Sequence, residues 1–329
     1  MRFKNIFRTL NGLGRYYLLN MRTPLSVIFS VTHKCNYKCI YCQVPKQANK
    51  DLSTEKVRLL IRQMANAGTQ RLGIQGGEPL LRNDIREIIN FAKENGLFVT
   101  MGTNGSLVKR KIDDIKRIDA LVTSYDGPKA HNIYRENGSS KKMIEAISTA
   151  VENGIKVWNV TVLSRNSMDD IDYILGLSRE IGFHTYFTPM MNLDSTGDTS
   201  LIIPLKGDYK RAIEKLMKLK KEKSNRILNS VPYLNYIYNW PDFKKTLIAG
   251  NYNCYASKLF CHIAPNGKVF PCINLMHKVD GYDALGLGFK NAFSKLSRIE
   301  CRCSTFSFVE LNLLFSLNFV AICNSIKQL

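Results

Sequence analysis

Three cysteines, Cys35, Cys39 and Cys42, stand in a Cys-x3-Cys-x2-Cys spacing directly after the apolar run 24–31. A loop this short can fold three thiolates around one metal cluster, and soft sulfur ligands select iron–sulfur, zinc or copper(I). Closed structural zinc sites need four ligands, whereas a four-iron cluster on three thiolates leaves one iron open. Zinc completed by His33 is the alternative, but His33 is too near in sequence to close a tetrahedron easily. The spacing therefore indicates an iron–sulfur cluster with one open position.

The elements that must position this loop follow from an alternation of apolar and helical patterns. Strand-like apolar runs cover residues 25–31, 71–74, 98–101, 120–123, 157–163 and 185–190, with helical patterns between them. Six such units predict an α/β fold with a parallel, curved sheet and helices outside it. Ligands of such sheets bind at the carboxyl ends of the strands. The cysteine loop follows the first predicted strand and so falls at that end.

Three more motifs follow apolar runs: Gln75-Gly76-Gly77-Glu78-Pro79, Thr103-Asn104-Gly105 and Ser124-Tyr125-Asp126-Gly127-Pro128. With Tyr41 before Cys42, the cysteine loop resembles the signature of the radical S-adenosylmethionine (SAM) superfamily, and these motifs stand in the order that family would place them. The resemblance covers roughly residues 24 to 192. It implies a partial (β/α)6 TIM-like barrel.

The resemblance also implies the cofactors and the chemistry. Cys35, Cys39 and Cys42 would hold a [4Fe–4S] cluster whose open iron is chelated by SAM. An electron from the reduced cluster would cleave SAM to methionine and a 5′-deoxyadenosyl radical, which abstracts hydrogen from the substrate. A flavodoxin- or ferredoxin-type reductant is the implied electron donor. The role of the protein would be to position SAM and to exclude water.

The glycine motif is assigned to the methionine part of SAM. Gly76 and Gly77 would let backbone carbonyls approach the methionine ammonium without an intervening Cβ, and Glu78 would add negative charge beside it, with Pro79 closing the motif. A simple strand-to-helix turn is the alternative for the glycine pair. The role of Asp126 is left open, because an aspartate before glycine is also a turn former.

Four further motif residues and Arg135 are assigned to the rest of SAM. Tyr41 is suited to lie near the adenine, Thr103 and Ser124 near the ribose, and Arg135 near the carboxylate, with Asn104 in the same turn as Thr103. Polar residues at strand ends are often only helix caps, which is the alternative for these assignments.

A second group of cysteines follows residue 250. The spacing Cys254-x12-Gly267-x4-Cys272 resembles the opening of the SPASM extension, or of its shorter form Twitch, which holds auxiliary clusters. An Asn266-Gly267 turn between short apolar strands predicts a hairpin that brings Cys261 and Cys272 together. We expect one auxiliary [4Fe–4S] cluster, and its ligands are Cys254, Cys261, Cys272 and one of Cys301 or Cys303. A zinc ribbon from the same thiolates is the alternative, and Cys323 is expected to be a buried small hydrophobe.

Composition bounds the compartment and the partners. Lys and Arg number 47 against 27 Asp and Glu, so the net charge is +20, and residues 1–24 hold five bases without one acid. A solvated basic surface is the simplest interpretation, with an anionic or membrane-surface contact as the alternative. No nucleic-acid contact is expected, because no basic stretch alternates with stacking aromatics in a recognisable module. Without a signal peptide or a continuous membrane span, we expect a cytoplasmic protein, and its cysteines are interpreted as metal ligands rather than as disulfides.

The predicted organisation has four parts. They are a basic amphipathic N-terminal helix (1–23), the radical SAM partial barrel (24–224), an aromatic-rich connector (225–250) and a small cysteine-rich auxiliary-cluster domain (251–329). The leading hypothesis is a radical SAM oxidoreductase acting on a peptide or small metabolite in a biosynthetic or maturation pathway. The alternative from another class is a non-catalytic, zinc-stapled basic binding protein on the same barrel.

Overall fold

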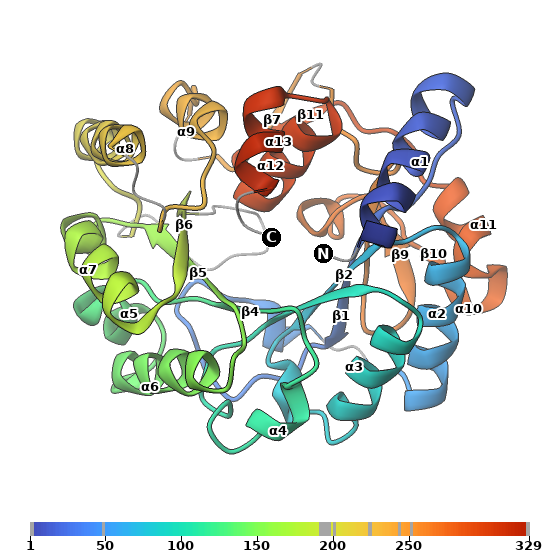
Figure 1. Ribbon diagram of the computed structural model, residues 1–329, viewed down its shortest axis with the longest axis horizontal. Helices are drawn as coiled ribbons and strands as arrows, with labels where there is room; N and C mark the ends of the chain where they lie inside the picture. The colour runs from blue at the N-terminus through green and yellow to red at the C-terminus, as the bar shows by residue number, and fades with distance from the viewer. Residues whose placement is uncertain are drawn as a thin grey trace.

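The computed structural model describes residues 3–47, 50–190, 199, 202–222, 226–242, 245–250 and 253–326. Strands and helices alternate from residue 26 to residue 189, and Figure 1 shows the helices outside a curved sheet. The strands are β1 (Ser26–Thr32), β2 (Arg71–Gly76), β3 (Phe98–Gly102), β4 (Ala120–Thr123), β5 (Val157–Leu163) and β6 (His184–Pro189). The helices between them are α2 (Thr54–Asn66), α3 (Ile85–Glu94), α4 (Ile112–Ile115), α5 (Pro128–Tyr134), α6 (Ser139–Glu152) and α7 (Ile171–Ile181). The predicted fold class, a partial (β/α)6 barrel, is confirmed.

The other elements precede and follow this barrel. The helices are α1 (Phe3–Leu19), α8 (Lys206–Lys221), α9 (Val231–Tyr238), α10 (Ala284–Leu287), α11 (Phe289–Ser294), α12 (Phe306–Phe315) and α13 (Phe319–Ile326). The strands are β7 (Leu247–Ala249), β8 (Phe260–Ile263), β9 (Lys268–Phe270), β10 (Tyr282–Asp283) and β11 (Cys301–Cys303). Short 3-10 helices cover Val44–Lys46, Pro79–Leu81, Met168–Asp170 and Ile273–Leu275.

One sheet of nine strands runs through the molecule in the order β10-β9-β8-β1-β2-β3-β4-β5-β6. The predicted hairpin is confirmed: β8 and β9 pair antiparallel, and Gly267 takes φ +85° in their turn. However, β8 also pairs in parallel with β1, with Cys261 beside Val27. The hairpin therefore continues the barrel sheet and covers an edge of β1 that would otherwise offer unpaired backbone groups. The predicted domain limits stay a prediction, and Asn225, 243–244 and 251–252 lie outside the described residues.

Alternating strand residues form the main core beneath the outer helices. The strand residues that face these helices are fully buried. They include Val27, Leu72, Val99 and Leu121, which share one core with Ile61 of α2, Ile89 of α3 and Ile147 of α6. Because β1 to β6 are parallel, their carboxyl ends share one rim of the barrel, where the predicted site residues follow.

Helix α1 packs at the opposite, amino-terminal end of the strands. Leu13 is buried against Leu25, which precedes β1, and Gly12 lies so close that an added Cβ would stand 2.4 Å from the Leu25 side chain. Phe308 of α12 stacks on Phe260 of β8 at 5.4 Å in the same cluster. The predicted N-terminal helix therefore packs across the bottom of the barrel. The side chains of residues 1–8 lie outside the described residues.

Among the described residues, no single helix is both long and apolar enough to cross a membrane. Helix α12 and residues Phe319–Ser325 of α13, which are bent by 115° relative to each other, reach that length and composition only as a pair.

Candidate functional site

The loop of Cys35, Cys39 and Cys42 leaves β1 and is fixed to the barrel rim through its backbone. The Ile40 amide donates to the carbonyl of Tyr134 at 2.9 Å, and the Cys42 amide donates to the carbonyl of Cys39 at 3.0 Å. All three thiols are partly exposed. Burial, opposed by Arg135 and assisted by the nearby Cys42 and Cys35, raises the pKa of Cys39 to about 11. The three thiols therefore form one electrostatically coupled group.

Gly76 and Gly77 clasp the segment that leads into this loop. The Gly77 amide donates to the Thr32 carbonyl at 2.9 Å, and the Glu78 amide donates to the Lys34 carbonyl at 2.8 Å. A Cβ at Gly76 would stand 2.1 Å from the Thr32 oxygen, and one at Gly77 would stand 2.2 Å from the Lys34 oxygen. The glycines are thus required by the approach of protein backbone, and their predicted place beside the methionine of SAM stays untested.

Glu78 is fully buried and ties two rim turns together. Its carboxylate accepts hydrogen bonds from the Leu80 amide at 3.0 Å, the Thr103 hydroxyl at 3.0 Å and the Asn104 amide at 2.7 Å. Pro79 is also buried and begins the short helix that carries Leu80. The Thr103 hydroxyl therefore donates to Glu78, and its predicted place near a ribose stays untested.

Asn104 extends this connection to the cysteine loop. Its Nδ2 donates to Asn36 Oδ1 at 2.9 Å and lies 3.7 Å from Cys35 Sγ, while its Oδ1 accepts from the Ser106 amide at 3.0 Å. Because both the nitrogen and the oxygen of the Asn104 amide are engaged, this side chain fixes Cys35 relative to the turn that follows β3.

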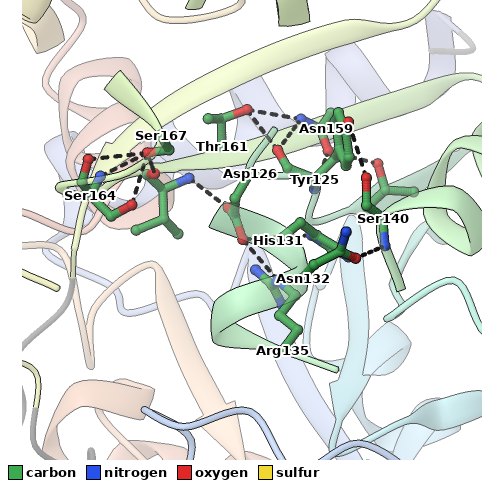
Figure 2. Close-up of polar contacts among 12 residues, drawn as sticks. Tyr125, Asp126, His131, Asn132, Arg135, Ser140, Asn159, Thr161, Ser164 and Ser167 are labelled. Atoms are coloured by element: carbon green, nitrogen blue, oxygen red, sulfur yellow. Dashed lines mark hydrogen bonds and ion pairs between the residues drawn. The ribbon is translucent and has the colours of Figure 1, made fainter. Parts of the chain in front are cut away.

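Asp126, whose role the sequence left open, forms a buried ion pair with Arg135 (Figure 2). Arg135 Nε donates to Asp126 Oδ2 at 2.8 Å, and Asp126 Oδ1 accepts from the Val162 amide at 3.0 Å. Although burial opposes it, Arg135 holds the pKa of Asp126 below its usual range. The guanidinium lies 5.6 Å from the ring centroid of Tyr41, beside Cys39. The pair thus fixes the Arg135 guanidinium next to the cysteine loop.

A polar network beneath this turn was missed by the sequence reasoning. Asn159 of β5 is fully buried; its Oδ1 accepts from the Tyr125 amide at 2.7 Å, and its Nδ2 donates to the Tyr125 carbonyl at 3.0 Å and to Thr161 Oγ1 at 3.0 Å (Figure 2). This network fixes the turn that begins with the partly exposed Ser124 and holds Asp126. An asparagine inside the apolar run 157–163 was the signal that could have revealed it.

The second cysteine group gathers four thiols around one cavity, which is lined by Cys254, Cys272, Cys301 and Cys303. Cys301 and Cys303 are the ends of β11, which pairs antiparallel with β7. Since strand residues two apart point to the same face, the tight Cys-x-Cys spacing sends both thiols to this cavity.

Cys261 is separated from these four thiols and differs from the expectation. Its neighbours on β8, Phe260 and His262, alternate with it, so it faces the outer helices and is buried in the barrel core. Burial alone raises the pKa of Cys261, whereas the pKa of Cys272 is raised by burial and then by the three other thiols of the cavity. The hairpin thus places Cys261 and Cys272 on different sides of the sheet. Cys323, expected to be buried, is partly exposed.

An amide side chain contacts one sulfur of the cavity: Asn312 Nδ2 lies 3.6 Å from Cys254 Sγ, and its Oδ1 accepts from the Tyr255 amide at 2.9 Å. Burial, followed by Cys254, raises the pKa of Cys303 to about 12, so a bound metal must displace its proton. Nowhere in the described ranges do three His, Cys, Asp or Glu side chains converge on one point as a single metal ion needs. Four thiols that line one cavity are a ligand set that could hold an iron–sulfur cluster, in which each thiolate binds a different iron.

The model of the radical SAM superfamily matches residues 29–177. This part of the chain is a radical SAM domain. The chain is 25% identical over 268 residues to the AdoMet-dependent heme synthase of Methanosarcina barkeri, a match that covers 76% of each protein. It is 23% identical over 264 residues to a PqqA peptide cyclase of Methylobacterium sp., and this match covers 76% of the chain and 66% of the cyclase.

The fold is shared with a solved structure, Streptococcus suis SuiB bound to S-adenosylmethionine. The TM-score is 0.70 at 16% identity, and the match covers 89% of this chain and 71% of SuiB. SuiB has also been solved bound to its precursor peptide SuiA. The cofactors expected from the sequence, a [4Fe–4S] cluster and SAM, are those of the radical SAM superfamily, and SPASM-type relatives carry auxiliary clusters.

Proposed function

We propose that the chain is a radical SAM enzyme in which Cys35, Cys39 and Cys42 hold the SAM-binding cluster. When bound, that cluster supplies the one-electron cleavage of SAM to methionine and a 5′-deoxyadenosyl radical. Three coupled thiols on one backbone-fixed loop support the assignment. Arg135, which Asp126 holds in place, offers guanidinium N–H donors for the methionine carboxylate, and Tyr41 offers a ring beside it.

Cys254, Cys272, Cys301 and Cys303 are the proposed ligands of one auxiliary [4Fe–4S] cluster. The observation that carries this proposal is that all four thiols line one cavity while Cys261 faces another core. Four protein ligands leave no iron open, so such a cluster supplies an electron acceptor rather than a substrate-binding metal. The proposed net reaction is therefore an oxidation. The substrate would lose a hydrogen atom to the deoxyadenosyl radical, and then one electron to the cluster and one proton to water.

A peptide is the proposed substrate, since a peptide cyclase is among the relatives and SuiB binds a precursor peptide on the same fold. A tetrapyrrole is the second candidate, because the match to the heme synthase covers 76% of that protein. A flavodoxin- or ferredoxin-type protein is the proposed reductant.

Anaerobic reconstitution with iron and sulfide tests the assignment. Brown protein with about eight irons per chain is expected, and with dithionite and SAM it should release 5′-deoxyadenosine. Colourless protein that retains zinc and leaves SAM intact would instead support the zinc-stapled binding protein. Adding candidate peptides or an iron porphyrin precursor and recording which one stimulates deoxyadenosine release then separates the two substrate classes.

A further inference from the structure

Large apolar side chains are exposed in two segments that are far apart in sequence. In and just after α1 they are Leu10, Tyr17, Leu18, Leu19 and Met21, and at the α12–α13 turn they are Leu317, Phe319 and Val320. Leu18 is 84% exposed and Phe319 is 77% exposed, so both project from the surface with few neighbours. Concentrated apolar exposure of this kind marks an interaction site.

The two segments meet on one side of the molecule. The Tyr17 hydroxyl donates to the Phe315 carbonyl at 2.7 Å and lies 2.7 Å from the Tyr255 hydroxyl. Figure 1 shows α1 and the α12–α13 pair along the same side. Leu18 and Leu19 directly follow Tyr17, and Leu317 comes two residues after Phe315. We call these eight exposed side chains the apolar patch.

The sequence segments that form the apolar patch, and the segment that it contacts, contain no acidic residue. Residues 1–24, 253–279 and 311–329, which include the patch and the segment that it contacts, hold no Asp or Glu. Arg15 is exposed on α1, and Lys258 Nζ lies 5.9 Å from the ring centroids of both Tyr16 and Tyr255. An apolar surface framed by cations complements a surface that is apolar and anionic at once.

The position of the patch suits docking without blocking the cysteine loop. Helix α1 packs beside Leu25, at the beginning of β1, whereas the cysteine loop follows the end of β1. Seven strand residues separate these ends by about 20 Å.

We propose that the apolar patch docks on an anionic lipid bilayer. Leu18, Leu19 and Phe319 enter the headgroup region, and Arg15 and Lys258 lie beside the phosphates. Protruding apolar side chains flanked by bases are the composition of interfacial binding, in which buried apolar area and attraction to anionic lipid add. A surface that binds another protein usually also presents polar groups at its rim, which form hydrogen bonds with that partner.

Vesicle co-sedimentation of the full chain tests this. Wild type should pellet with phosphatidylcholine vesicles that contain phosphatidylglycerol about tenfold more than with phosphatidylcholine alone, and high salt should reduce the difference. The Leu18→Ser/Leu19→Ser/Phe319→Ser variant should lose binding, and Arg15→Gln/Lys258→Gln should lose the preference for anionic vesicles. The matched control is Leu59→Ser/Leu205→Ser, which changes exposed leucines elsewhere and should bind as wild type.

The proposal is overturned if wild type ignores anionic vesicles or if the control variant loses binding equally. It is also overturned if light scattering shows a wild-type dimer that the triple variant abolishes while vesicle binding persists, since the patch would then bind a second copy. Circular dichroism of every variant checks folding, which these exposed positions should leave unchanged.

Discussion

The two cysteine groups differ in how the chain collects their thiols. Cys35, Cys39 and Cys42 lie on one loop beside the buried Asp126–Arg135 ion pair. The four cavity cysteines come from separate segments between residues 254 and 303 and are surrounded by apolar side chains such as Phe260, Leu275 and Phe308. One site is a local motif with an ionic support, and the other is a product of long-range packing.

This difference predicts different consequences of damage. Removing a thiol from the loop should abolish chemistry and leave the fold intact, because the loop is held by backbone bonds to the rim. Removing cavity thiols should cost both a cluster and stability, because metal binding there connects segments that only packing otherwise holds together.

The largest effect is expected for Cys39→Ala. Two thiolates cannot hold the SAM-binding cluster, so release of 5′-deoxyadenosine should disappear while about four irons remain in the auxiliary site. Iron analysis and chromatography of the reaction with dithionite measure both quantities. Cys323→Ala, a partly exposed cysteine outside both groups, is the control and should behave as wild type. Unchanged SAM cleavage by Cys39→Ala would contradict the assignment of this loop to the SAM-binding cluster.

The next effect is expected for Cys254→Ala/Cys272→Ala. The auxiliary cluster should be lost and the thermal midpoint should fall, while about four irons and SAM cleavage uncoupled from substrate conversion remain. Full wild-type iron content in this double variant would mean that other residues ligate the auxiliary cluster.

Asp126→Asn tests how much the cysteine loop depends on the buried ion pair beside it. It leaves the Arg135 guanidinium buried without its counterion, and breaking a buried pair costs about 3 kcal/mol in the free energy of unfolding. SAM affinity should also weaken, because Arg135 is no longer held beside Tyr41. Urea unfolding and equilibrium SAM binding measure the two effects. Asp113→Asn, which removes an exposed pair with Lys116, is the matched control and should change stability by less than about 0.5 kcal/mol.

Glu310 of α12 gives the packed region a pH dependence. Its carboxylate accepts from the Ser230 amide at 2.7 Å, and burial raises the pKa of Glu310 to about 7. Between the unfolded pKa near 4.5 and pH 7 the unfolded chain releases this proton while the folded chain keeps it, so stability falls as pH rises through this window. Glu310→Gln keeps an acceptor for Ser230 and should gain on the order of 2 kcal/mol at pH 8 and almost nothing at pH 4. Equal gains at both pH values would contradict this account.

The smallest effect is expected for Cys261→Ala. Because this thiol faces the barrel core, the variant should keep the full iron content and lose only about 1 kcal/mol of stability to a small cavity. Iron content is measured for Cys261→Ala and for Cys272→Ala under the same conditions, and the two values are compared. Loss of four irons in Cys261→Ala would return Cys261 to the ligand set.

The sequence predicted the features that depend on near neighbours. All six barrel strands were placed within two residues of their observed ends, because apolar runs and turns are local signals. The thiols of the cysteine loop were grouped for the same reason. Hairpin pairing of β8 with β9 was also local, through the Asn266-Gly267 turn.

Features that depend on distant packing were not predicted. The side to which Cys261 points is set by the pairing of β8 with β1, and nothing in the hairpin sequence encodes that partner. The ion pair of Asp126 and Arg135 requires α5 to fold back over the β4 turn. The hydrogen bonds of Glu78 to Thr103 and Asn104 join two turns that meet only in the folded barrel, and its predicted place beside methionine stays untested.

Because β8 pairs with β1, one edge of β1 stays unpaired during synthesis until β8 has been made. Strand β1 emerges from the ribosome early, and its β8 neighbour, residues 260–263, follows more than two hundred residues later. At roughly 5–20 residues per second the edge of β1 stays without this partner for about 10 to 50 s. An apolar edge strand left open this long is a template for wrong pairing between chains. The yield of folded protein should therefore depend on how fast residues 33–263 are made.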